Sequence, residues 1–301
     1  MICKKAFSAL TALTVALTFS LAGASFALAE ETPALQGRTS LAPKSAITAK
    51  AAFGMKALTA KTDSSVVVVP AGSTTSQKEG NRIIINHGTS HNVCNTWFRI
   101  KPKHSGYIEV SESASGRITL CSASKRPLSG AIYTYVYASS ESNQSVFFGV
   151  KAGSTYYLKV RSSGSKEESG YYLNKVAYAS YAFTGKYGKS SSKAAKLSRG
   201  KLRKGYIVPN GKAKYYKFTK RGKTVKIYLA GCTDKQLKMS VTAKAKGFRT
   251  YKTSTSVHRY DNNQSTRVLT LTTHGKTRTM SVKVKVDGVG NSSGAYVLYY
   301  K

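Results

Sequence analysis

Short runs of alternating apolar and polar residues fill much of the chain. In Thr224–Leu229 and Ser281–Val286, lysine falls on one side of the alternation and an aliphatic residue on the other, as in a strand with one solvated face. Between Ser64 and Ala179, similar runs rich in Val, Ile, Tyr and Phe are separated by Gly, Ser and Asn, and good helix signals are absent. The pattern predicts an all-β protein built from antiparallel β-sandwiches.

One stretch of this pattern occurs twice. Thr155–Val160 is followed by Gly170, and Thr279–Val284 is followed by Gly294, so that each glycine lies fifteen positions after the threonine. Two copies of one unit predict two tandem domains of one fold. We place these domains at residues 64–179 and 194–301, joined by a linker at residues 180–193 that is rich in Gly, Ser and Lys.

The beginnings of the two units also agree. In both copies, at Trp97–Ile100 and Tyr215–Phe218, an aromatic pair precedes a basic residue and an apolar residue, and a Gly-led alternating strand follows. With the closing Gly153–Val160 and Gly170–Leu173, this resembles the bacterial pre-peptidase C-terminal domain family over residues 78–178 and 194–301. The resemblance implies jelly-roll-like β-sandwiches, secretion and an accessory, non-catalytic role.

The chain departs from that family in its acidic residues. The acidic residue that family members carry before the aromatic pair is Thr96 in one copy and Lys214 in the other. Related collagen-binding modules hold calcium through clustered acidic side chains, and this chain has no such cluster. The resemblance therefore implies fold and location, and neither calcium nor collagen.

The first 29 residues have the three parts of a secretory signal peptide. Lys4 and Lys5 precede an apolar run that ends in Ala27-Leu28-Ala29, with small residues where a signal peptidase cuts. A membrane anchor is the alternative, but Ser, Thr and Gly interrupt the run and acidic residues follow it. We predict cleavage, export and no membrane span, followed by a low-complexity flexible arm at residues 30–63. The predicted location is extracellular, with charge holding the protein at the cell surface.

The charge is large and unevenly distributed. The formal net charge is +36, from 48 Lys and Arg against 12 Asp and Glu, and residues 186–301 carry 28 basic and three acidic residues. A field of this size attracts polyanions. Basic residues interleaved with aromatics in and near the strands of the second domain are the candidate polymer contacts: Lys212, Lys214, Lys217, Lys220, Arg221, Lys223, Lys226, Lys283 and Lys285.

Tyrosine is the second signal, with 20 residues in the chain. A tyrosine ring offers flat stacking area and a polar tip, which suits sugars and exposed interfaces. Core and edge positions of a sandwich also favour tyrosine through β-propensity, so either role is open for each residue. The candidate aromatic face consists of Tyr133, Tyr135, Tyr137, Tyr215 and Tyr216.

Three cysteines remain after export. Cys94 and Cys121 lie on neighbouring strand patterns of one domain, and we predict a disulfide between them. Cys232 is then free or pairs between chains. His87, His91 and Cys94 have a spacing that could hold zinc on a helix, but the intervening Gly, Thr and Ser favour a loop and no fourth ligand is near, so we predict no metal.

Catalytic motifs are absent from the sequence. The second domain has only three acidic residues, scattered from Asp234 to Asp287, and the chain has no Gly-x-Ser-x-Gly elbow or phosphate loop. We predict a non-enzymatic secreted binding protein without a cofactor, which attaches to anionic cell-wall polymers or mucin-type glycans. The alternatives are a lectin-like or protein-binding adhesin that uses tyrosine faces, and a structural module of the cell surface. Export argues against nucleic acid as the intended partner, and the oligomeric state stays open.

Overall fold

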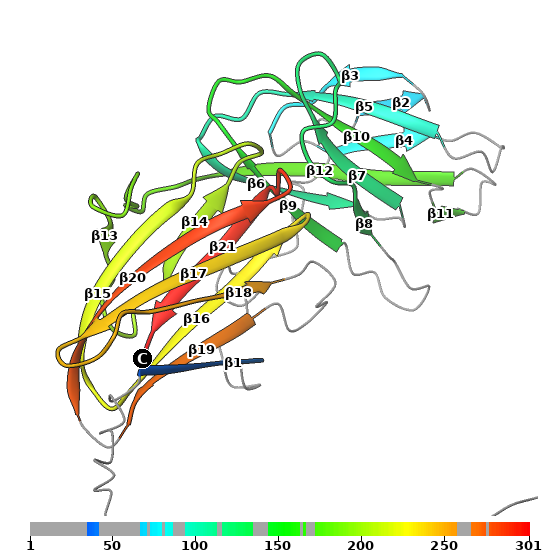
Figure 1. The fold of residues 1–301 in the computed structure, drawn as a ribbon. Helices are drawn as coiled ribbons and strands as arrows, with labels where there is room; N and C mark the ends of the chain where they lie inside the picture. Colours follow the sequence, from blue (N-terminus) through cyan, green and yellow to red (C-terminus); the bar gives the residue numbers. More distant parts are fainter. Residues whose placement is uncertain are drawn as a thin grey trace, which may run out of the picture. The chain divides into compact units, whose positions relative to one another are not determined.

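A computed structural model describes residues 35–41, 67–70, 73–79, 82–86, 94–112, 116–134, 144–162, 165–166, 172–257, 266–274 and 277–301. Within these ranges the chain forms strands and no helix (Figure 1). The prediction of an all-β fold with antiparallel sheets is confirmed. The predicted signal peptide and most of the predicted arm lie outside the described residues.

The first sandwich has two sheets. One sheet has the order β3 (Thr74–Ser76), β5 (Cys94–Ile100), β10 (Tyr156–Ser162), β7 (Gly116–Cys121) and β8 (Ile132–Thr134). The other has the order β2 (Val67–Pro70), β4 (Arg82–Asn86), β12 (Tyr172–Ala182), β6 (Gly106–Glu112) and β9 (Gln144–Val150), with β11 (Ser165–Lys166) paired to β12. Only the β2–β4 and β3–β5 pairs among these are parallel.

The second sandwich is built in the same way. One sheet has the order β13 (Ala195–Lys196), β15 (Lys214–Gly222), β20 (Arg278–Val289), β17 (Gln236–Ala245) and β18 (Tyr251–Val257). The other has the order β1 (Leu35–Leu41), β19 (Thr266–Thr273), β16 (Thr224–Thr233), β21 (Gly294–Tyr300) and β14 (Arg203–Ile207).

The strand order of the second sandwich repeats that of the first. Strands β13, β15, β20, β17 and β18 take the places of β3, β5, β10, β7 and β8, and β14, β21, β16 and β19 take those of β4, β12, β6 and β9. The closing strands that resemble each other in sequence, β10 and β20, are both the middle strand of a five-stranded sheet. The duplicated sequence therefore coincides with a duplicated topology.

Alternate residues of facing sheets form the two cores. In the first sandwich, Leu158 and Val160 of β10 meet Ile108 and Val110 of β6, and all four are inaccessible to solvent. In the second, Val282 and Val284 of β20 share a cluster with Leu229 of β16. Because strand side chains alternate, the residues between these core positions point outward.

Strand β1 corrects the prediction of a flexible arm. All seven residues of β1 pair with β19, which places this strand beside it at the edge of the second sandwich (Figure 1, blue beside orange). The side chain of Leu35 joins the core with 5% of its surface exposed. The ring of Tyr251 lies against Gly37, where a Cβ atom would come within 2.6 Å of it. The pairing depends on a strand about 230 residues away, so no local pattern signals it.

The predicted linker is partly ordered by β15. Strand β12 continues to Ala182, beyond the predicted domain end at residue 179. Gly188 and Tyr215 then exchange two backbone hydrogen bonds, of 2.9 Å and 3.0 Å. Glycine is required at position 188 because a Cβ atom would meet the backbone of Lys193 at 2.1 Å.

Candidate functional site: a lysine-rich sheet face

The outer side of the sheet that contains β15, β20 and β17 carries the candidate site. On β20, Val282, Val284 and Val286 point into the core, so Lys283 and Lys285 point outward. The same alternation on β17 buries Met239 and exposes Lys238 and Lys244. Each lysine is thus positioned by the burial of its aliphatic neighbours.

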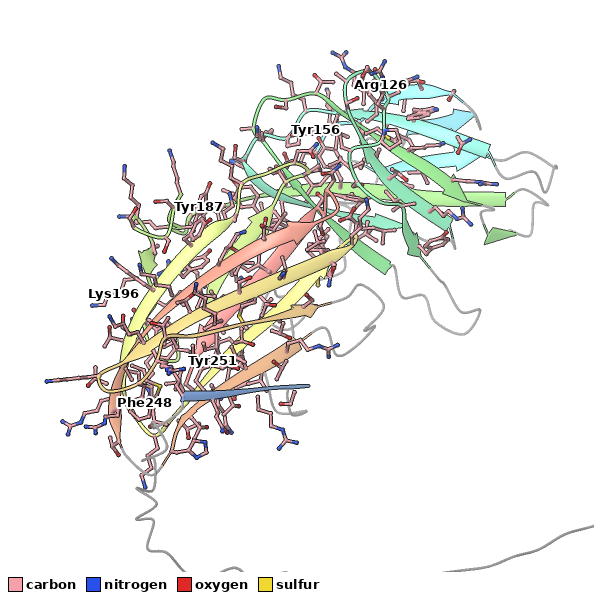
Figure 2. All side chains as sticks on the ribbon, viewed as in Figure 1. Arg126, Tyr156, Tyr187, Lys196, Phe248 and Tyr251 are labelled. Atoms are coloured by element: carbon pink, nitrogen blue, oxygen red, sulfur yellow. The ribbon has the colours of Figure 1, made fainter. Side chains whose placement is uncertain are left out.

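Strand pairing brings four lysines from separate segments into one row. Lys217 lies directly opposite both Lys196 of β13 and Lys283 of β20. Thr242 of β17 then lies between Lys283 and Lys252 of β18. Adjacent strands are about 4.8 Å apart, so the row crosses the sheet over roughly 20 Å. All four lysines are exposed, and Lys196 marks the β13 edge of the sheet in Figure 2.

The rest of this surface carries basic and hydroxyl side chains. We call it the lysine face and define it by its outward basic residues: Lys196, Lys217, Arg221, Lys238, Lys244, Lys252, Lys283 and Lys285. Between them lie Tyr215, Thr219, Ser240, Thr242, Ser254, Ser256, Thr279 and Ser281. The outward positions of these paired strands include no aliphatic residue other than Val289 at the end of β20.

One carboxylate accompanies these eight basic residues. Asp287 forms a salt bridge of 3.0 Å with Lys285, and the hydrogen bond between them raises the pKa of Lys285 above its ordinary value. Lys285 therefore stays protonated, and its charge is partly neutralised within the protein. Asp287 also lies directly opposite Lys238 of β17, whereas the remaining lysines of the face have no carboxylate opposite them in the described sheet.

The predicted polymer contacts divide between four places, the fourth being the inward side of β15. Lys217, Arg221, Lys283 and Lys285 lie together on the lysine face. Lys226 points outward from β16, which belongs to the opposite sheet. Lys212 and Lys223 are exposed in the connections before and after β15.

Lys214 and Lys220 occupy the inward side of β15. Each is an even number of residues from Tyr216 and Phe218, which are core residues, so its side chain leaves the strand on the core side. Lys214 is 7% exposed, and its Nζ lies 3.8 Å from the ring centroid of Tyr187. The Nζ of Lys220 donates a hydrogen bond of 3.2 Å to the carbonyl of Thr224, and burial lowers the pKa of this lysine. The structure does not place either ammonium group on the lysine face.

The three described members of the predicted aromatic face do not share one surface. Tyr216 is fully buried, and its hydroxyl lies 2.7 Å from that of Tyr296. Tyr215 lies on the lysine face, whereas Tyr133 lies on β8 beneath the guanidinium of Arg117, at 4.5 Å. The other two predicted positions, Tyr135 and Tyr137, lie outside the described residues.

Four residues of the lysine face were missed by the sequence reasoning: Lys196, Lys238, Lys244 and Lys252. The alternation in Leu237–Ala245 could have indicated that Lys238 and Lys244 face outward together. Lys196 lies on a two-residue strand, and Lys252 lies on a strand in which residues 253–256 are all Thr or Ser. Only the strand pairing shows that these two join the row.

The predicted disulfide is wrong. Cys121 is a buried free thiol, and burial raises its pKa to about 11. Along β10, Cys94 lies opposite Ser162 and Cys121 opposite Tyr157, on the two different sides of that strand. Five residues of strand span about 17 Å, whereas a disulfide needs Cα atoms within about 7 Å.

The described part of the chain has neither a cluster of metal-ligating side chains nor a long apolar helix. It contains no group of three or more His, Cys, Asp or Glu side chains that could hold a metal ion. His87 and His91 lie outside it. None of its segments is a helix of the length and apolarity needed to cross a membrane.

Comparison with known proteins gives no family. No family model matches the chain, and no curated protein matches it in sequence. The resemblance to the pre-peptidase C-terminal family therefore stays a prediction.

Solved structures give only remote likenesses. The tandem CBM22-1–CBM22-2 domain of Paenibacillus barcinonensis Xyn10C has 8% identity and a TM-score of 0.20, covering 66% of this chain and 80% of that one. The CUB1-EGF-CUB2 domain of human MASP-1/3 has 10% identity and a TM-score of 0.19, covering 68% and 99%. The PBSX exported protein XepA has 7% identity and a TM-score of 0.19, covering 63% and 81%. TM-scores this low do not indicate a shared function.

Proposed function

We propose that the protein is a secreted, non-enzymatic binding protein that attaches to anionic surface polymers through its lysine face. The single observation that carries this proposal is the row formed by Lys196, Lys217, Lys283 and Lys252. Like charges directly opposite each other on a sheet destabilise it. A bound polyanion would relieve that repulsion.

The shape of the face favours a polymer over a small ligand. The charges lie on an open sheet surface about 20 Å across, with serine and threonine hydroxyls between them. Several weak contacts spread over such a surface suit repeated negative charges, each accepting a hydrogen bond from an ammonium group. Binding would release counterions and would weaken as salt rises.

Export supports the choice of polymer class. The sequence pattern of residues 1–29 indicates secretion, and outside the cell the abundant polyanions are wall polymers and acidic mucin-type glycans. Charge-driven attachment would then retain the protein at the surface. The lectin-like adhesin remains the rival function, since Tyr215 also lies on this face.

Retention on cell wall tests the proposal. Mature protein is applied to isolated bacterial wall, to the same wall stripped of its anionic polymers, and to mucin, and each support is washed with rising salt. We expect retention on intact wall and mucin, release at moderate salt, and weak retention on stripped wall. Equal retention on stripped wall, or retention that resists salt, would overturn the proposal and favour a specific adhesin.

A further inference from the structure

The first sandwich has a face that combines aromatic rings with ammonium groups. On the outer side of the sheet that contains β5 and β10, the rings of Trp97 and Tyr157 lie edge to face, with centroids 6.4 Å apart and planes at 82°. Their strand neighbours Phe98 and Leu158 are fully buried. Because side chains alternate along each strand, both rings point outward, and both are half-buried.

Two lysines surround these rings. The Nζ of Lys125 lies 5.1 Å from the ring centroid of Trp97 and 5.3 Å from that of Tyr157. The Nζ of Lys159 lies 5.4 Å from the centroid of Trp97. The Nζ of Lys125 also donates a hydrogen bond of 2.9 Å to the hydroxyl of Thr74. No carboxylate among the described residues pairs with either ammonium group, so both keep their positive charge available.

The turn that carries Lys125 holds this lysine in an unfavourable conformation. Its φ angle is +59°, in the left-handed region that favours glycine. The backbone N–H of Lys125 donates to the carbonyl of Ser122 at 3.0 Å, and the N–H of Ser122 donates to the carbonyl of Arg126 at 2.8 Å. Arg126 marks this loop in Figure 2. Backbone strain of this kind clusters at ligand-binding and catalytic sites.

We propose that these residues form a second binding site, for an acidic saccharide. The ring of a sugar would stack on Trp97, and its carboxylate would accept hydrogen bonds from Lys125 and Lys159. Aromatic rings supply flat apolar area, and the ammonium groups supply the anion contact. The lysine face has ammonium groups and hydroxyls but no tryptophan, so the two sites suit different ligands. This inference does not depend on the function proposed for the lysine face.

The single tryptophan of the chain reports on this site directly. The fluorescence of Trp97 in the mature protein is titrated with a hyaluronan hexasaccharide, which carries uronate groups, and with neutral chitohexaose. We expect a saturable change with the hyaluronan oligosaccharide, and an affinity for chitohexaose that is weaker by about tenfold or more. The oligonucleotide dT8 tests the other ligand class that stacks on aromatic rings. Equal binding of chitohexaose, tighter binding of dT8, or no change with any of them would overturn the proposal.

Matched variants separate binding from folding. Lys125→Gly should weaken hyaluronan binding by about tenfold, while thermal stability stays equal or rises because glycine adopts the positive φ without strain. Lys159→Gln should weaken binding similarly, and the exposed Lys103→Gln should not. Unaltered binding by Lys125→Gly would contradict the proposal. Substitution of the lysine face should leave this fluorescence titration unchanged, so that failure of one site is distinguishable from failure of the other.

Discussion

Lys214 and Lys217 lie three positions apart on β15 and have opposite environments. Lys214 is on the core side, with its ammonium group over the ring of Tyr187, whereas Lys217 faces solvent opposite Lys283. A strand side chain changes face at every residue, so an odd spacing separates the two. A basic run in sequence thus contributes only alternate members to any one surface.

Neutralising one member of the row should stabilise the protein. Lys283 lies directly opposite Lys217, and removing such a repulsion is worth about 0.2–1 kcal/mol. We expect Lys283→Gln to raise the free energy of unfolding in urea at low salt, and the gain to shrink as salt screens the charges. The exposed Lys201→Gln should change little. A destabilised Lys283→Gln variant would contradict the account of this row.

The hydroxyl pair of Tyr216 and Tyr296 gives a second prediction. Their oxygens lie 2.7 Å apart in the core, so Tyr216→Phe alone should leave the Tyr296 hydroxyl unsatisfied and cost about 1–3 kcal/mol. Replacing both residues by Phe should cost less than twice that amount, because no polar group is then stranded. Chemical unfolding of the three variants measures the difference. Strict additivity would show that the hydroxyls do not interact.

The same pair should make stability depend on alkaline pH. Burial raises the pKa of Tyr216 to about 12 and that of Tyr296 well above its ordinary value of 10. The unfolded chain therefore releases these protons at a lower pH than the folded protein does. The contribution of the two hydroxyls to the free energy of unfolding is complete below pH 10 and is lost as pH rises toward 12. We expect the double Phe variant to have a shallower loss of stability over this interval. An unchanged pH profile would contradict the shifted pKa values.

At the scale of elements, alternation allowed the strands and their inward residues to be predicted. Val282, Val284 and Val286 are core residues, as the pattern of β20 indicates. Pairing could not be predicted, because it depends on segments far apart in sequence. For that reason the contribution of β1 and the position of Lys252 in the row emerge only from the fold.

Strand β1 should be sensitive to a side chain at Gly37. A Cβ atom there would meet the ring of Tyr251, whose hydroxyl donates to the Gly37 carbonyl at 3.3 Å. We expect Gly37→Val to displace β1 and lower the melting temperature by several degrees, in line with about 1–3 kcal/mol of overpacking. The exposed Thr39→Val on the same strand is the control.

A second substitution that removes the Tyr251 ring tests whether this ring causes the effect of Gly37→Val. In a Tyr251→Ala background the clash is absent, so Gly37→Val should then cost much less than in the native background. Equal costs in both backgrounds would contradict the contact between β1 and Tyr251.

At the scale of the whole molecule, two repeats with one strand order present different outer faces. Lys159 lies between Trp97 and Thr119 in the first sandwich, and Lys283 lies between Lys217 and Thr242 in the second. The lysine on the middle strand is shared, but the residue paired with it on the neighbouring strand is tryptophan in one copy and lysine in the other. The duplicated fold therefore carries one face that combines tryptophan with lysine and one face dominated by lysine.

The large net charge complicates any test of polymer binding. With a formal charge of +36, the whole molecule attracts polyanions wherever its lysines lie. Loss of affinity in a lysine variant is therefore informative only beside a control of equal charge. Four exposed lysines outside the lysine face provide that control: Lys103, Lys151, Lys186 and Lys201.

The most direct test compares two variants of equal charge in binding to purified wall teichoic acid. One has Lys196, Lys217, Lys252 and Lys283 replaced by Gln, and the other has the four control lysines replaced by Gln. Affinity is measured by calorimetric titration of the mature protein over a series of salt concentrations. The account predicts that the slope of log K against log salt becomes shallower by roughly 3 for the lysine-face variant, one contact for each lysine removed, and changes little for the control. Equal slopes for the two variants would show that binding follows total charge, and would contradict a built polymer-binding face.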